Sequence, residues 1–272
     1  MHVFYIGKRA VLRTVILFCS LALILATGIM SWNNRPAVAP QPGLEPSGPE
    51  PVYHGDSKQK MVALTCNVDW GEEYLPGMLE LFQAKKVKVT FFVTGRFADK
   101  SPDLVRKLAA AGHEIGNHGY EHFHPDQFSR EENAAEVRKA EKALRGANVK
   151  VSRLYAPPYG ESGPAVLQGA ADCGYKTILW SVDTVDWQKP DPETIVQRVV
   201  GKMQGGDIVL MHPTDSTLKA LPTIIDRLQQ NGYTLVTVSE MLKPAKAGFP
   251  RVNGGGGAKG GKGKDGGIKK RP

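Results

Sequence analysis

Cysteine is scarce in this chain, which has 272 residues and three cysteines, Cys19, Cys66 and Cys173. None of them has the CxxC or CxxH spacing of a cysteine-based metal site, so that kind of site is excluded. Cys19 falls within an apolar segment near the N-terminus, which leaves two cysteines for the rest of the chain. Two are too few for a disulfide framework. We therefore expect Cys66 and Cys173 to be free thiols.

An excess of positive charge is lacking outside the C-terminal tail. The formal net charge is +8, but residues 251–272 contain seven Lys or Arg and one Asp and so account for +6 of it. The remainder is near neutral and offers no basic face for nucleic acid, which excludes that class of partner. Residues 245–272 are rich in Gly and Lys with almost no apolar side chains, and we predict a disordered tail there.

Long apolar runs are also lacking, with one exception at residues 15–32, which Lys8, Arg9 and Arg13 precede. A run of about 18 residues is at the lower limit for a membrane span. We predict an uncleaved signal-anchor within residues 1–32, with a cleaved signal peptide as the alternative. Either places the following domain outside the cell, because the positive flank stays inside. Residues 33–59 are predicted to form a Pro-rich linker.

Residues 60–244 alternate between strand-like and helix-like patterns, and this alternation predicts parallel strands joined by helices. Right-handed crossovers over about seven units favour a barrel or a doubly wound sheet. The predicted strands are residues 61–68, 87–93, 113–117, 153–156, 175–182, 208–211 and 233–238.

Polar side chains follow several of these strands, where parallel folds carry their chemistry. His118 and His122 are four residues apart, so one helical turn would point both imidazoles the same way. Neutral imidazole is a common metal ligand, and Asp69 after the first strand would complete a three-ligand site with one open position. Alone, the histidine pair is a weak signal for a metal site, and a solvated His-rich loop is the alternative.

His212 follows the sixth predicted strand and is placed to donate a proton to a leaving group. Either Asp183 or Asp186 could orient its imidazole. The backbone amide near Tyr159 could stabilise an oxyanion. Three aromatic side chains that could wall a sugar-sized groove follow the same strands: Trp70, Tyr159 and Trp187.

These residues resemble the polysaccharide deacetylases of the NodB-homology type, carbohydrate esterase family four, over roughly residues 61–242. In residues 65–71, Asp69 stands at the family's metal-ligand position and Asn67 at its catalytic base. Residues 117–122 match the two-histidine motif, and residues 183–187 and 208–212 match the fourth and fifth motifs. Residues 156–160 read Ala-Pro-Pro-Tyr-Gly, where the family has Arg first.

The resemblance implies an α/β fold, an irregular (β/α)7 barrel, and a divalent metal. Zinc is the first expectation, with cobalt or another divalent ion as the alternative. The metal ligands it implies are Asp69, His118 and His122. The catalytic positions are His212, Asn67, Asp186 and Tyr159, and the substrate-binding positions are Pro158, Tyr159, Trp187 and Leu210.

The implied function is metal-dependent N-deacetylation of an extracellular polysaccharide, peptidoglycan- or chitin-like, by a monomer anchored at the outer face of the membrane. Asn67 cannot take a proton at neutral pH, and Ala156 removes the arginine that pairs with the base in the family. Glu72 or Glu73 could replace the base. The alternative is a weak or inactive domain that binds cell-wall glycan, and a third hypothesis is hydrolysis of another amide.

Overall fold

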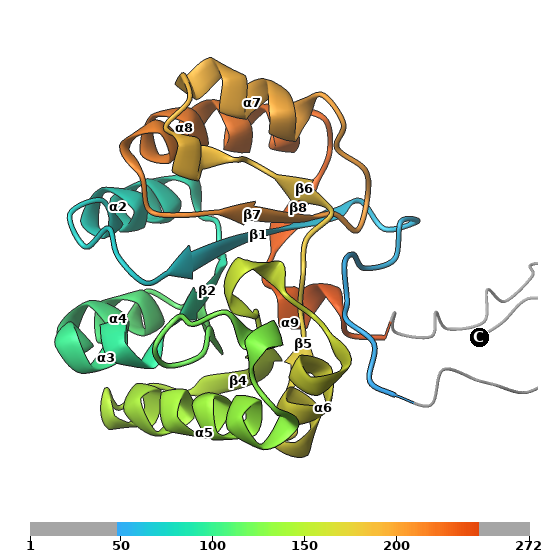
Figure 1. Cartoon of the computed structure of the whole chain (residues 1–272). Helices are drawn as coiled ribbons and strands as arrows, with labels where there is room; N and C mark the ends of the chain where they lie inside the picture. Colours follow the sequence, from blue (N-terminus) through green and yellow to red (C-terminus); the bar gives the residue numbers. More distant parts are fainter. Residues whose placement is uncertain (1–47, 245–272) are drawn as a thin grey trace, which may run out of the picture. The chain divides into compact units, whose positions relative to one another are not determined.

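The computed structural model describes residues 48–244, which contain one sheet of parallel strands (Figure 1). The sheet has the order β5-β4-β3-β2-β1-β7-β6, and β8 pairs with β1 off this path. Its strands are β1 (Met61–Val68), β2 (Thr90–Val93), β3 (Glu114–Asn117), β4 (Val151–Tyr155), β5 (Lys176–Thr177), β6 (Val182–Asp183), β7 (Ile208–Met211) and β8 (Thr234–Val236). This confirms the predicted parallel α/β architecture.

Helices connect the strands and pack around the outside of the sheet (Figure 1). Their starts follow from local sequence. The longest begins with a capping box of Ser129 and Glu132, and α7 begins with Asp191, whose side chain accepts from the Glu193 N–H. The helices are α2 (Leu75–Lys85), α3 (Gly95–Lys100), α4 (Pro102–Ala110), α5 (Arg130–Gly146), α6 (Pro164–Asp172), α7 (Pro192–Val200), α8 (Asp215–Gln230) and α9 (Val238–Met241).

The sheet curls as a half-barrel whose edges are β5 and β6. The single strand predicted at residues 175–182 is wrong, because this segment forms β5 at one edge and β6 at the other. Between them, the Leu179 N–H donates to the Val52 carbonyl at 2.8 Å, and the Ser181 hydroxyl bonds to Asp207 at 2.8 Å. The chain therefore crosses the open side of the half-barrel, which a propensity pattern does not reveal.

Residues 52–55, near the end of the predicted linker, also lie at this open side. Val52 bridges to Ile178 in parallel fashion, and His54 bridges to Asp207 in antiparallel fashion. The Gly55 N–H donates to the Gly206 carbonyl at 2.7 Å. This short segment thus links the end of β5 to the start of β7.

The central strand β1 is buried from Val62 to Val68, as expected of a parallel strand covered on both faces. Its register pairs Val68 with Val93 of β2 and Cys66 with Met211 of β7. Parallel strands end at the same edge, so the residues that follow β1, β2, β3 and β7 converge there. Cys66 is free and buried, and burial raises the pKa of its thiol.

The predicted anchor at residues 1–32 and the tail at residues 245–272 lie outside the described residues. Within residues 48–244, no helix combines the length and apolar character that crossing a membrane requires.

Candidate active site

A cavity of about 470 Å³ opens at the carboxyl edge of the sheet. It gathers most of the residues singled out from the sequence, but not Glu72, Glu73, Pro158 or Asp186. Pro158 is buried and does not line the cavity, and Asp186 lies behind His212. The lining residues are Asn67, Asp69, Trp70, His118, His122, Tyr159, Gly160, Trp180, Asp183, Trp187, Leu210 and His212.

His118 follows β3 directly and is 2% exposed. Its Nδ1 lies 2.7 Å from the carbonyl oxygen of Ala156, which can only accept, so Nδ1 carries the proton. The Nε2 lone pair is left free beside the cavity. Burial, and then the charge of His122, lower the pKa of His118 to about 3. The imidazole is therefore neutral and available as an acceptor or ligand at neutral pH.

His122 and Tyr159 both occupy the left-handed backbone region, with φ of 58° and 59°. The imidazole of His122 lies 5.0 Å from that of His118 and 4.8 Å from the Tyr159 ring, centroid to centroid. Tyr159 also stacks on His124 at 3.8 Å. Non-glycine residues seldom adopt this conformation, and they persist where surrounding contacts enforce it, often at functional sites.

Asp69, the third predicted ligand, is held by one cation, Arg96, and one hydroxyl, that of Thr94. Arg96 Nε donates to Oδ1 at 2.6 Å and Arg96 Nη2 donates to Oδ2, while the Thr94 hydroxyl donates to Oδ1 at 2.9 Å. Burial works to raise the pKa of Asp69, but the hydrogen bonds from Arg96 and Thr94 outweigh it and lower the pKa overall. The carboxylate is therefore charged and already paired.

This arrangement fits a divalent metal only in part. The two imidazoles are close together and His118 presents a free Nε2, as a metal would require. Both oxygens of Asp69, however, are occupied by Arg96. Across residues 48–244, no three or more His, Cys, Asp or Glu side chains are grouped so that they could hold an ion. The three-ligand set is thus incomplete as arranged, and zinc or cobalt stays a prediction from the resemblance.

His212 is oriented by Asp186, which resolves the choice between Asp183 and Asp186. The fully buried Asp186 carboxylate accepts from His212 Nδ1 at 2.7 Å, from the His212 backbone N–H at 2.6 Å and from the Thr217 hydroxyl at 2.5 Å. With its proton on Nδ1, the imidazole turns Nε2 to the cavity. It lies parallel to the Trp70 ring at 6.2 Å.

A tight turn at Val185 explains why Asp186 rather than Asp183 reaches His212. Val185, a β-branched residue, has φ of 52°, and such a conformation costs about 1–3 kcal/mol. The Val185 N–H donates to Asp183 Oδ1 at 2.8 Å, and Arg198 donates to the Thr184 carbonyl at 2.8 Å. These bonds hold the tight turn that sends Asp186 inward beneath His212.

Asn67, which the resemblance places at the position of the catalytic base, is 5% exposed. Its Oδ1 is buried without a hydrogen-bond partner among the described residues. An unmet buried acceptor costs about 1–3 kcal/mol, so a donor brought by a ligand would be stabilised there. The replacement bases considered from the sequence are not in position. Glu72 pairs with Lys100, Glu73 is exposed, and neither lines the cavity.

Aromatic rings form the rim of the cavity. Trp70, Tyr159 and Trp187 are exposed by 44%, 56% and 56%, which is unusual for such large apolar side chains. Trp180 was missed from the sequence, because it lay within the strand wrongly predicted at residues 175–182. A Cβ at Gly160 would lie 2.5 Å from the Trp180 ring, so only glycine allows this close packing.

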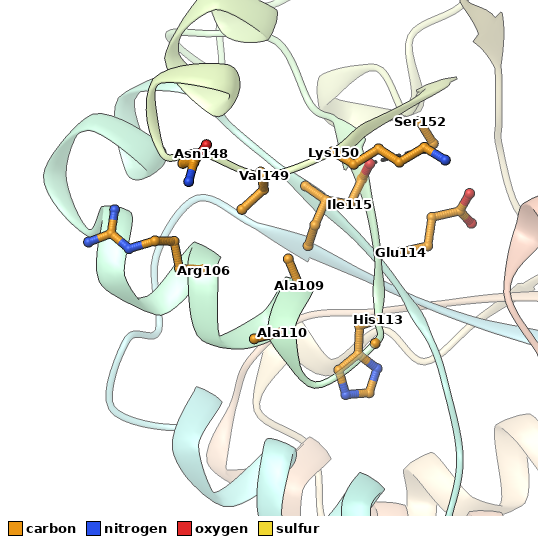
Figure 2. Close-up of a pocket in the computed structure, with 11 residues that line it drawn as sticks. Arg106, Ala109, Ala110, His113, Glu114, Ile115, Asn148, Val149, Lys150 and Ser152 are labelled. Atoms are coloured by element: carbon orange, nitrogen blue, oxygen red, sulfur yellow. Dashed lines mark hydrogen bonds between the residues drawn. The ribbon is translucent and has the colours of Figure 1, made fainter.

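A larger hollow of about 590 Å³ lies at the opposite edge, near the start of β3 and β4 (Figure 2). Its labelled side chains include Ala109, Ile115 and Val149, and the charged Arg106 and Lys150 lie apart from one another. His113 points away from them. Because the candidate ligands and the oriented His212 line the smaller cavity, we assign the chemistry to that cavity.

Comparison with known proteins shows the family of the chain. The family model for polysaccharide deacetylase matches residues 54–178. The YlxY protein of Bacillus subtilis is 38% identical over 75% of this chain, which spans 64% of that protein. A peptidoglycan-N-acetylglucosamine deacetylase of Bacillus cereus is 35% identical over 74% of this chain and 96% of its own length.

A crystal structure of a pseudoenzyme of carbohydrate esterase family 4 from Bacillus anthracis superposes with a TM-score of 0.69. The two sequences are 41% identical, and the match covers 75% of this chain and 73% of the pseudoenzyme chain. The resemblance noted in the motifs is therefore confirmed, as is the prediction of a polysaccharide deacetylase-like hydrolase that acts on C–N bonds. With the cavity, the oriented imidazole and the relatives in agreement, the chain belongs to the polysaccharide deacetylase family.

Proposed function

We propose that the cavity binds an N-acetylated extracellular glycan of the peptidoglycan or chitin kind and releases its acetyl group only slowly. The observation that carries this proposal is Asn67, buried in the cavity at the position of the general base. Its amide cannot accept a proton at neutral pH. The unpartnered Oδ1 can instead accept a hydrogen bond from an amide N–H or a hydroxyl of the glycan.

The remaining groups suit the same ligand. Trp70, Tyr159 and Trp187 offer exposed faces on which sugar rings can pack. His212 turns Nε2 to the cavity, where in its protonated form it would donate to the departing amine. Loss of base assistance alone would reduce the rate by about 10²–10⁴. Binding and leaving-group protonation are thus supported, while proton abstraction lacks its residue.

The relatives support two outcomes. The pseudoenzyme among the similar structures favours a binding domain with weak or no turnover. The deacetylases, one named for N-acetylglucosamine and another from Bacillus subtilis named for N-acetylmuramic acid, favour full N-deacetylation as the second candidate.

Acetate release from N-acetylated chito-oligosaccharides and peptidoglycan fragments separates these outcomes. Calorimetric titration with the same fragments should detect binding, while acetate appears at a rate at least about 10²-fold below that of a matched family enzyme with Asp at the base position. Rapid release by the unaltered chain would replace the proposal with the second candidate. If neither binding nor release occurs, the glycan assignment fails.

The aromatic rim provides an independent test. Trp187→Ala should weaken glycan binding about fivefold, which corresponds to about 1 kcal/mol. The matched control is Tyr53→Ala, because Tyr53 is 48% exposed and does not line the cavity. Equal affinities for the two variants would argue against glycan contact at the rim.

We further propose that the domain is a monomer held at the extracellular face of the membrane by residues 1–32, with secretion after cleavage as the alternative. Cell fractionation of the full chain and of a chain lacking residues 1–32 tests this. If cells that express the full chain release a shortened product into the medium, with the mass expected after signal cleavage, secretion is favoured. Sedimentation of the full chain in detergent tests the monomer.

A further inference from the structure

The ion pair between Arg96 and Asp69 is unusual in its setting. The Asp69 side chain is 8% exposed, and the Arg96 side chain is 46% exposed. The guanidinium donates to both carboxylate oxygens in the two-pronged geometry that arginine forms best. Asp69 lines the cavity, while the more exposed Arg96 binds its carboxylate from outside the lining.

The position of Arg96 is fixed by the fold. It belongs to the first turn of α3, and its backbone N–H donates to the Tyr120 carbonyl at 3.2 Å. A Cβ at the preceding Gly95 would overlap the Tyr120 ring and lie 2.9 Å from the Ala140 Cα. The glycine thus lets α3 approach the loop that carries His122. Arg96 is brought to Asp69 by backbone packing.

The placement of Arg96 would weaken the binding of a divalent metal at this site. A metal held by Asp69, His118 and His122 would need an Asp69 oxygen that Arg96 and Thr94 now occupy. The guanidinium would also stand close to the ion and repel it. Arg96 therefore both competes for the Asp69 oxygens and places a positive charge beside the predicted metal position.

We propose that Arg96 is the resident cation of this site and competes with a divalent metal for Asp69. Its guanidinium balances the charge of the buried Asp69 carboxylate. The site accordingly binds divalent cations weakly. This inference does not depend on which glycan the cavity takes.

The test is zinc titration of the full-length chain after chelator treatment, with metal content measured by mass spectrometry. Arg96→Gln should bind Zn²⁺ at least about tenfold more tightly than the unaltered chain, a change of about 1.4 kcal/mol. The matched control is Arg130→Gln, because Arg130 makes the same two-pronged pair with Asp172 at 2.6 Å for both bonds. It should leave the zinc affinity unchanged.

Second substitutions locate the gain. Adding His118→Ala or Asp69→Asn to Arg96→Gln should abolish the extra zinc binding, and the same holds for His122→Ala. If the gain survives these changes, the ion binds elsewhere and the proposal is overturned. It is also overturned if Arg96→Gln binds zinc equally or more weakly, since Arg96 would then orient Asp69 as a supporting partner of the metal.

Arg96→Lys guards against a folding defect. Lysine keeps the charge but loses the two-pronged geometry. Its zinc affinity should fall between those of the unaltered chain and Arg96→Gln, provided thermal melting shows a folded chain. A lysine variant that binds zinc more weakly than the unaltered chain contradicts the competition. Because zinc binding is read without substrate, its outcome is independent of glycan binding and acetate release.

Discussion

One buried histidine flanks each end of β3, His113 before it and His118 after it. The two imidazoles differ in which ring nitrogen carries the proton. At the carboxyl end, His118 Nδ1 donates to a carbonyl, so Nε2 is a lone pair beside the cavity. At the amino end, His113 Nδ1 accepts from the Val89 N–H at 3.2 Å, so its proton is on Nε2. The His113 ring is packed edge-on against Phe82 and Phe91. One is available to a ligand, while the other completes the core.

The hollows at these two edges differ in the same way. The larger one, at the amino edge, is lined by Ala109, Ile115 and Val149, with Arg106 and Lys150 on different sides (Figure 2). The smaller one collects three imidazoles, two carboxylates and an unpartnered amide oxygen. Strand direction, and not volume, therefore identifies the candidate site in this fold.

The largest expected effect is a gain at the carboxyl edge. Asn67→Asp supplies a proton acceptor, and acetate release from N-acetylated chito-oligosaccharides should rise by about 10²–10⁴. Adding Ala156→Arg should increase it further, because the arginine stabilises the new buried carboxylate. The control Asn67→Leu has no acceptor and should stay slow. A folded Asn67→Asp variant without any gain would show that a missing base does not limit this site.

The next effect concerns the orientation of His212. In the Asn67→Asp background, Asp186→Asn should lower acetate release about 10²-fold, because the amide offers an N–H where His212 and Thr217 donate. It should also lower the free energy of unfolding by about 1–3 kcal/mol. Asp183→Asn is the control, because Asp183 accepts a hydrogen bond from the Val185 backbone N–H and does not bond to His212. Equal losses of activity from both variants would remove the special role of Asp186.

A smaller effect should appear at the amino end of β3. Burial, and then the charge of Lys88, lower the pKa of His113 to about 4 from an ordinary value near 6.5. As the pH falls from about 6.5 toward 4, the unfolded chain binds a proton that the folded chain refuses, so stability is lost. The loss from this residue should be about 3 kcal/mol by pH 4.

His113→Gln should reduce that pH slope, because glutamine can still accept from Val89 N–H but does not titrate. Urea unfolding at several pH values between 6.5 and 4 measures it, with the exposed His54→Gln as control. An unchanged slope in His113→Gln would mean that other groups cause the acid sensitivity.

The smallest effect is expected at the larger hollow. Lys150→Ala removes a charged side chain from its lining, and glycan affinity and acetate release should both stay within about twofold. Calorimetry and the acetate assay check this beside Trp187→Ala. A loss comparable to that of Trp187→Ala would place part of the glycan site at the amino edge and erase the contrast between the two edges.

Much of the framework was predictable because it depends on local pattern. The bounds of β1 and β7 agree with the predicted ranges, and the alternation of elements implied that Asp69, His118 and His212 would share one edge. The motif resemblance then supplied their roles, which stay predictions for this chain.

What could not be predicted depends on distant partners. The break between β5 and β6 requires the Val52 carbonyl, which lies far away in sequence. The pairing of Arg96 with Asp69 requires α3 to approach the His122 loop, and no spacing rule encodes that approach. The choice of Asp186 over Asp183 requires a valine in a left-handed turn, which its residue type disfavours.

Residues 52–55, which hydrogen-bond to the end of β5 and to the start of β7, also determine how the domain would bear mechanical load. Any tether that pulls from the chain before residue 48 transmits its force first to the hydrogen bonds of Val52 and Gly55. Those bonds engage the end of β5 and the start of β7, so the pull would be shared between two strands instead of peeling one. Because Leu179 bonds to Val52 and Trp180 lines the cavity, tension on the tether would reach the cavity wall within two residues.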